Sequence, residues 1–219
     1  MLCHDPRLDR TTTGQGRVSA HNLATLRRYD AGRWFAPEFT GEPVPTFEET
    51  LALAAELGLS ANVEIKAERG QGPATAAAVA AALERVEGRL PPVLVSSFLR
   101  PALAAMRDLA PAVPRGLLLR AVPLRWRRIA ARLDCATINV DHRRLSPRLT
   151  ADIRNTGYPL LAYTVNDPQR AQTLFEWGVT SVFSDVPDII LAVSGLAPPV
   201  RPIVAGANSS VGMRQGAIS

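Results

Sequence analysis

Short apolar segments alternate with longer segments of helical periodicity from residue 60 onward. Six apolar segments have the length of strands and span residues 62–66, 93–98, 116–119, 137–141, 160–165 and 181–184. Strands that alternate with helices are typical of a parallel sheet with crossover helices. The strands are short and regularly spaced, and no Gly-x-Gly-x-x-Gly sequence follows any of them. The pattern therefore favours a (β/α) barrel over a dinucleotide-binding sheet.

The same pattern predicts seven helices, over residues 23–29, 47–57, 74–86, 101–109, 124–133, 147–155 and 168–177. Thr46 and Glu49 have capping-box spacing at the start of the second helix. Pro101 suits a first helical turn, where its missing N–H costs nothing. Gly157 and Gly178 stand where a C-cap glycine is expected.

Two segments depart from this alternation. Glycines and prolines interrupt residues 14–47, which predicts a long loop inserted over the carboxyl-terminal face of the barrel, where it shapes a pocket. Residues 197–219 are rich in Pro, Gly and Ser and offer little apolar surface to bury, which predicts a disordered tail. The length of the chain then predicts one barrel domain over residues 1–196.

Composition excludes some classes of protein. Hydrophobic residues make up 47% of the 219 residues, yet no apolar run approaches the roughly 18 residues that span a bilayer. No signal peptide is visible at the start, so a cytoplasmic location is expected. Residues 115–154 hold ten arginines and three aspartates, a basic patch that could meet nucleic acid. Because these arginines are scattered through helical segments and aromatic residues are scarce, solvent-exposed helix faces are the better interpretation.

Two segments end in side chains that can carry chemistry. His4 and Asp5 follow a short apolar start that is expected to be the end of a strand, and Glu64 and Lys66 end the predicted strand 62–66. Glu64 and Lys66 are two residues apart, so they point to the same face of a strand. Lys66 is also the only lysine in the chain. A carboxylate suits Mg²⁺ or Ca²⁺ and an ammonium suits a phosphate oxygen, although each pair alone is equally compatible with a structural ion pair.

Six short sequence motifs, which occur in order over about residues 3–190, make the pattern more specific. Together with a seventh motif they resemble the glycerophosphodiester phosphodiesterase family. The six motifs are His4-Asp5-x-x-Leu8-Asp9-Arg10-Thr11-Thr12-x-Gly14-x-Gly16, Asp30-Ala31-Gly32-x-Trp34-Phe35, Gly41-Glu42-x-x-Pro45-Thr46-x-Glu48-Glu49, Asn62-x-Glu64-Ile65-Lys66, Ser96-Ser97-Phe98 and Tyr163-Thr164-Val165-Asn166-Asp167, and the seventh is Ser184-Asp185-x-Pro187.

The resemblance implies a (β/α)8 barrel that hydrolyses a glycerophosphodiester to glycerol 3-phosphate and an alcohol. It also implies a divalent metal, Mg²⁺ or Ca²⁺, and two histidines as acid and base. By this resemblance His4 matches the second catalytic histidine, Glu64 a metal-ligand glutamate and Lys66 the catalytic lysine on the phosphate side.

The same resemblance suggests residues that bind the substrate. Tyr163 stands where many members have a tryptophan that lines the pocket. Trp34 and Phe35 are expected to form an apolar wall for the glycerol or alcohol portion of a small-molecule substrate. The alternative, that both rings only anchor the loop onto the barrel, is equally compatible with their size.

The chain also departs from the family pattern. Members open with a His-Arg-Gly strand and a Glu-x-Asp strand that hold the first histidine and two metal carboxylates, and neither is found in the sequence. We therefore expect a barrel that is incomplete at its amino terminus and an impaired activity. A non-catalytic remnant that binds a phosphorylated glycerol or a protein partner is the main alternative, and a basic nucleic-acid-binding domain is the third.

Overall fold

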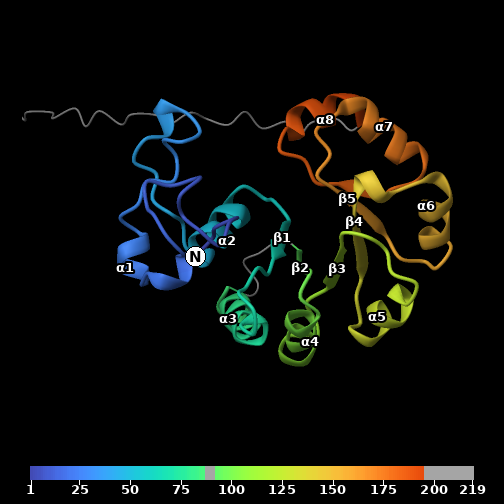
Figure 1. Cartoon of the computed structure of the whole chain (residues 1–219), viewed down its shortest axis with the longest axis horizontal. Coiled ribbons are helices and arrows are strands. Elements are labelled where there is room, and N and C mark those ends of the chain that lie inside the picture. Colours follow the sequence, from blue (N-terminus) through green and yellow to red (C-terminus); the bar gives the residue numbers. More distant parts are fainter. Residues whose placement is uncertain (87–91, 195–219) are drawn as a thin grey trace, which may run out of the picture.

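The computed structural model describes residues 1–86 and 92–194, and its centre is a parallel sheet whose six strands follow one another in chain order (Figure 1). The expected tail, residues 197–219, lies outside the described residues. Each strand pairs in parallel with the next. The strands are β1 (Ala61–Glu64), β2 (Val93–Ser97), β3 (Arg115–Leu119), β4 (Thr137–Asp141), β5 (Leu160–Tyr163) and β6 (Ser181–Val182).

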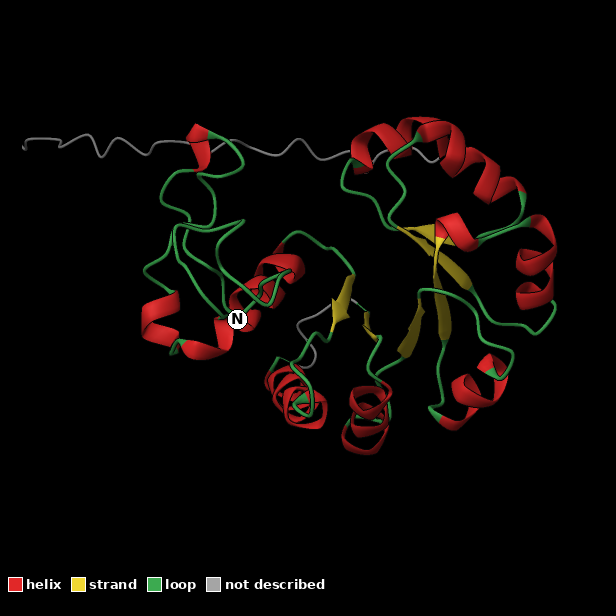
Figure 2. Cartoon of the chain, in the orientation of Figure 1, coloured by secondary structure: helices red, strands yellow, loops and turns green. Residues whose placement is uncertain are grey.

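Helices cross over between the strands and cover the outer side of the curved sheet (Figure 2). They are α3 (Gly72–Arg85), α4 (Arg100–Leu109), α5 (Trp126–Arg132), α6 (Pro147–Arg154) and α7 (Pro168–Glu176), and α8 (Pro187–Ser194) follows β6. The predicted α/β architecture is therefore confirmed as a six-stranded half-barrel, in which β1 and β6 are the edges of the described sheet. No described helix is long and apolar enough to cross a membrane.

The elements differ from the predicted ranges mainly at their ends. β1 stops at Glu64, because the pairing with β2 ends at Ser96, and Lys66 lies in the loop that follows rather than in the strand. β6 has only two residues. Helix α8 was not expected, because residues 189–193 are a continuous apolar run without helical periodicity.

Residues 1–46 form a layer of turns and short helices beside the sheet (Figure 1). It contains the 3₁₀ helices η1 (Val18–Ala20) and η2 (Pro37–Phe39) and the single turn of helix α1 (Leu23–Leu26). The interpretation of His4 as the end of a strand is wrong, because this layer has isolated β-bridges only. Helix α2 (Phe47–Glu56) then begins at Thr46 with the predicted capping box.

Side chains alternate between the two faces of the sheet, as strand geometry requires. The outward-facing residues pack under the helices in two apolar clusters, one around Val95 over β1 and β2 and one around Ile138 over β3 to β6. Helix α4 belongs to both, since Met106 lies in the first cluster and Leu103 in the second. Polar residues of the inner face, among them Asn62, Glu64 and Ser96, line the cavity described next.

Candidate active site

A cavity of about 640 Å³ opens on the inner face of the sheet, at the carboxyl ends of the strands. In parallel barrels this end carries the residues that do chemistry, since the loops that follow each strand converge there. Every strand of the described sheet contributes to the wall or is followed by a residue that does. The lining residues are His4, Asp5, Pro6, Asn62, Glu64, Ile65, Lys66, Ala67, Ser96, Phe98, Leu99, Leu118, Arg120, Asp141, Arg143, Tyr163, Thr164 and Phe183.

Glu64 and Lys66 meet in this cavity as expected, although Lys66 reaches it from the loop after β1 and not from the strand. Lys66 Nζ lies 3.6 Å from Glu64 Oε2 and donates a hydrogen bond of 3.3 Å to the backbone oxygen of His4. Glu64 Oε1 is buried and has no hydrogen-bond partner among the described residues, and the same is true of Ser96 Oγ. An unsatisfied buried carboxylate oxygen is costly, so Glu64 is suited to a ligand that brings a positive charge or a donor.

The His4 imidazole is held by a carboxylate that is itself held by an arginine. His4 Nδ1 lies 2.8 Å from Asp5 Oδ1, and Arg10 binds both oxygens of Asp5 at 2.6 and 3.1 Å. The hydrogen bonds from Arg10, and then from His4, hold the pKa of Asp5 well below its usual range. Asp5 is therefore ionised and can only accept, so Nδ1 carries a hydrogen and Nε2 is the nitrogen that can exchange a proton.

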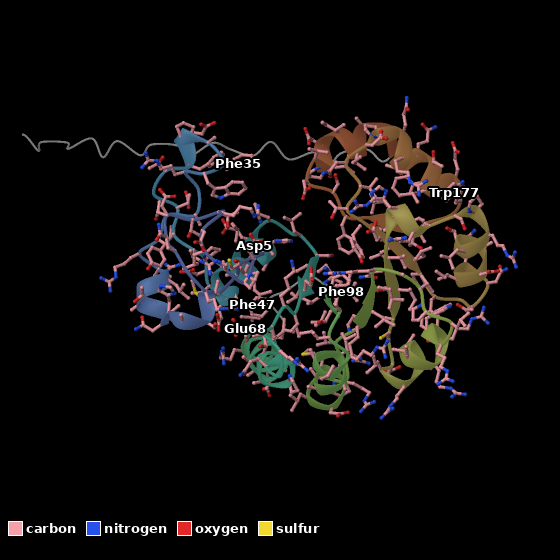
Figure 3. All side chains as sticks on the ribbon, in the orientation of Figure 1. Asp5, Phe35, Phe47, Glu68, Phe98 and Trp177 are labelled. Carbon is pink, nitrogen blue, oxygen red and sulfur yellow. The ribbon has the colours of Figure 1, made fainter. Side chains whose placement is uncertain are left out.

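The loop after β1 also ties the amino-terminal layer to the sheet. Glu68 Oε1 accepts hydrogen bonds from Arg17 at 3.0 Å and from Ser19 at 2.8 Å. With the contact from Lys66 to His4, these bonds place the His4 segment beside the end of β1. Figure 3 shows Asp5 and Glu68 on this side of the molecule.

Tyr163 forms the opposite wall with Phe98. The Tyr163 hydroxyl donates to the backbone oxygen of Leu119 at 2.9 Å, and the two rings meet edge to face with centroids 5.7 Å apart. Burial, followed by the negative charge of Asp141, raises the pKa of Tyr163 to about 12. The ring is therefore a fixed, neutral part of the wall at physiological pH.

Trp34 and Phe35 are not equivalent. Trp34 lines a second cavity of about 590 Å³, which adjoins the first through His4 and Thr164. Phe35 lines neither cavity, is 71% exposed, and contacts only the neighbouring rings of Trp34 and Phe39 among the aromatic residues described (Figure 3). The geometry thus places one ring of the expected apolar wall beside a cavity and leaves the other outside.

Several residues of the site were missed from the sequence. Asp141 ends a predicted strand, which was a signal that could have identified it. Arg120 and Arg143 follow strands too, but they are hidden among the many other arginines of residues 115–154. Asp5 is adjacent to His4 in the sequence, but its role could not be predicted because the contact with Arg10 that fixes its charge is visible only in the structure.

The described residues bring together no complete set of protein ligands for a divalent ion. Within residues 1–86 and 92–194, no three His, Cys, Asp or Glu side chains lie close enough to hold a metal. Glu64 offers one free oxygen. Mg²⁺ often takes one or two carboxylates and completes its shell with water and substrate phosphate, so these residues could be part of a metal site without making one on their own.

Comparison with known proteins agrees with this geometry. Residues 1–189 match the model of the glycerophosphoryl diester phosphodiesterase family. The chain is 32% identical over 207 residues to a glycerophosphodiester phosphodiesterase of Bacillus subtilis, which covers 86% of this chain and 70% of that protein.

Solved structures show the same fold. A phosphodiesterase of Oleispira antarctica, solved in complex with the product sn-glycerol 3-phosphate, is 34% identical with a TM-score of 0.83, and the match covers 87% of this chain and 77% of that one. A glycerophosphodiester phosphodiesterase of Agrobacterium tumefaciens is 23% identical with a TM-score of 0.69, over 87% and 80% of the two chains. Since the family model spans most of the chain, the protein belongs to the glycerophosphoryl diester phosphodiesterase family.

Proposed function

We propose that the protein hydrolyses glycerophosphodiesters to glycerol 3-phosphate and an alcohol. The observation that carries the proposal is that three functional groups line one cavity. They are the Lys66 ammonium, the unpartnered Glu64 oxygen and the oriented His4 imidazole. Family membership and the similarity to a phosphodiesterase bound to sn-glycerol 3-phosphate support it.

Each of these residues has a distinct task in the proposed reaction. In hydrolysis a water molecule loses a proton as its oxygen bonds to phosphorus, the bond from phosphorus to the alcohol oxygen breaks, and the alcohol oxygen takes up a proton. His4 Nε2 can transfer one of these protons, because Nδ1 is committed to Asp5. Lys66 has three donors and uses one of them on the backbone oxygen of His4, beside its ion pair with Glu64, so donors are left for a phosphate oxygen. Tyr163 and Trp34 supply apolar surface for the glycerol or alcohol carbons.

We also propose dependence on Mg²⁺ or Ca²⁺, with Glu64 as one ligand. The buried oxygen of Glu64 supports it. When bound beside a phosphodiester, such an ion acts as a Lewis acid on the phosphoryl group. The described residues do not by themselves complete the site of such an ion.

The experiment measures release of glycerol 3-phosphate from glycerophosphocholine with added Ca²⁺ or Mg²⁺ and with a chelator. Glu64→Gln is expected to lose most of the turnover at nearly constant shape, whereas Glu84→Gln, an exposed control on α3, keeps it. Calorimetric titration with Ca²⁺ in the presence of glycerol 3-phosphate gives a readout that needs no turnover. Activity that is unaffected by both Glu64→Gln and the chelator would contradict the metal dependence.

The same measurements distinguish catalysis from binding alone. The alternative is a non-catalytic protein that binds a phosphorylated glycerol. It is favoured by one observation, namely that the described residues bring together no group of three metal ligands. Binding of glycerol 3-phosphate without turnover at any metal concentration would support that alternative. The prediction of impaired activity is tested by comparison with the Bacillus subtilis relative, since equal turnover numbers would contradict it.

A further inference from the structure

Among the described residues, the charged side chains that line the main cavity have ion-pair partners, with one exception. Arg143 Nε lies 3.2 Å from Asp141 Oδ1, and Lys66 lies 3.6 Å from Glu64. Burial alone would raise the pKa of Asp141, but hydrogen bonds from the backbone and side chain of Arg143 outweigh it and hold the pKa below its usual value. Asp141 is thus ionised, and both acids on the sheet, Glu64 and Asp141, already have a cation beside them.

Arg120 is the cation that remains. It follows β3 directly, lines the cavity and is exposed, and it makes no ion pair or hydrogen bond with the rest of the described chain. Its guanidinium carbon lies 5.7 Å from the centre of the Phe98 ring, which is in turn buttressed by Tyr163. Stacking on an aromatic face holds an arginine in place while leaving its N–H groups free.

Arg120 and Lys66 stand apart along the sheet. Lys66 follows β1 and Arg120 follows β3, and two strand spacings separate the ends of these strands by about 10 Å. A phosphodiester beside Lys66 therefore leaves Arg120 available for a different group, on the alcohol portion of the same substrate.

We propose that Arg120 selects glycerophosphodiesters whose alcohol carries an anionic group, a carboxylate or a further phosphate. The inference rests on the proposed function. A guanidinium forms paired hydrogen bonds with either anion. The Phe98 face is already covered by a cation, so it is not free to receive the quaternary ammonium of a choline group.

The sharpest test uses two substrates that differ by one carboxylate, glycerophosphoserine and glycerophosphoethanolamine. Dissociation constants are measured by calorimetry on the full chain with Ca²⁺ present and with His4→Ala in every protein compared, because loss of the proposed proton transfer keeps the substrates from being consumed during the titration. Glycerophosphoserine is expected to bind about tenfold more tightly, as a charge-assisted hydrogen-bonded pair allows. Arg120→Gln should remove this preference and leave the binding of glycerophosphoethanolamine nearly unchanged.

Two further variants make the test specific. Arg128→Gln removes the same charge from an exposed position on α5 and should leave the preference intact. Arg120→Lys keeps the charge without the planar fork and should retain only part of the preference. A substrate that carries a second phosphate, compared with glycerophosphoglycerol, shows whether phosphate serves in place of carboxylate.

The outcomes separate this inference from the proposed function. Equal binding of the two matched substrates by the protein that keeps Arg120 would overturn the selection by Arg120 and leave the proposed function standing. An equal loss for both substrates in Arg120→Gln would show that Arg120 contacts the shared phosphodiester, which overturns the inference as well. Failure of both substrates to bind the protein that keeps Arg120 would remove the proposed function together with the inference.

Discussion

At the scale of single residues, the most informative contact is the one between Asp5 and Arg10. The pair at 2.6 Å fixes the charge of Asp5, and this charge decides which nitrogen of His4 carries its hydrogen. An exposed ion pair of this kind adds little to stability. The pair matters for the tautomer of His4, because an imidazole that carries its hydrogen on Nε2 has no lone pair there with which to accept a proton.

We therefore predict that Asp5→Asn lowers kcat by about tenfold or more and changes KM little, as expected for a group that acts in proton transfer. The amide can point its NH₂ group toward Nδ1 and so favour the wrong tautomer. Steady-state release of glycerol 3-phosphate measures both constants. Asp9→Asn is the matched control, since Asp9 is an exposed carboxylate paired with Arg7 outside the cavity. Equal effects of the two variants would contradict the role of Asp5.

Tyr163 carries a second prediction, on stability at high pH. The pKa of Tyr163 is raised from 10 to about 12, first by burial. Between pH 10 and 12 the unfolded chain has lost this proton and the native chain has kept it, so stability falls as pH rises through this window. Tyr163→Phe lacks the group and should be less stable at pH 8 by about 1 kcal/mol, the value of one hydrogen bond.

The measurement is the free energy of unfolding in urea from pH 8 to 11 for both proteins. The difference between them should narrow above pH 10. A difference that stays constant over the whole range would show that the Tyr163 hydroxyl ionises alike in the folded and unfolded chains.

At the scale of elements, Arg115 connects the start of β3 with the ends of the helices on either side. It is 2% exposed, and its guanidinium donates to the backbone oxygens of Pro111, Val113, Leu133 and Asp134 and to the carboxylate of Asp134. The segments after α4 and α5 thus place their carbonyl groups around one buried cation.

Arg115→Met should lower the free energy of unfolding by about 3 kcal/mol, because several buried carbonyl groups lose their donor. Asp134→Asn should cost less than about 1 kcal/mol, since the Asp134 carboxylate is exposed and asparagine tolerates its positive φ. Chemical unfolding of the two variants measures both values. A larger loss for Asp134→Asn would show that the carboxylate, and not the backbone, stabilises this junction.

The elements also show how far the sequence could predict the fold. The strands after residue 60 were predictable because their pattern is local, and the Thr46–Glu49 capping box formed for the same reason. The prediction of a strand before His4 was wrong, because a strand needs a partner and no described strand lies beside that segment. The site was predictable where strand ends converge, as at Glu64. It was not predictable at Arg120, whose meaning depends on which other charges are already paired.

At the scale of the whole molecule, the two apolar clusters divide the sheet. One cluster holds Val95 of β2 and Met106 of α4, and the other holds Leu117 of β3 and Leu103 of α4. Contiguous packed units of this kind often open separately, each with its own free energy. We predict two classes of amide hydrogen exchange, with slower exchange in β3 to β5, whose cluster is larger. A single rate for the slowest amides of β2 and β4 would contradict the division.

This division passes through the active site. Glu64 and Lys66 lie on or just after β1, which packs under the smaller cluster. Arg120, Asp141 and Tyr163 lie on or just after β3, β4 and β5, which pack under the larger cluster. By this prediction the two walls of the cavity belong to different cooperative units, which α4 and the pairing of β2 with β3 hold together. Mild denaturant should therefore separate the walls, and abolish ligand binding, while most of the circular dichroism of the helices persists. The conditions under which the protein binds its ligand are then set by the stability of the smaller cluster and not by that of the whole molecule.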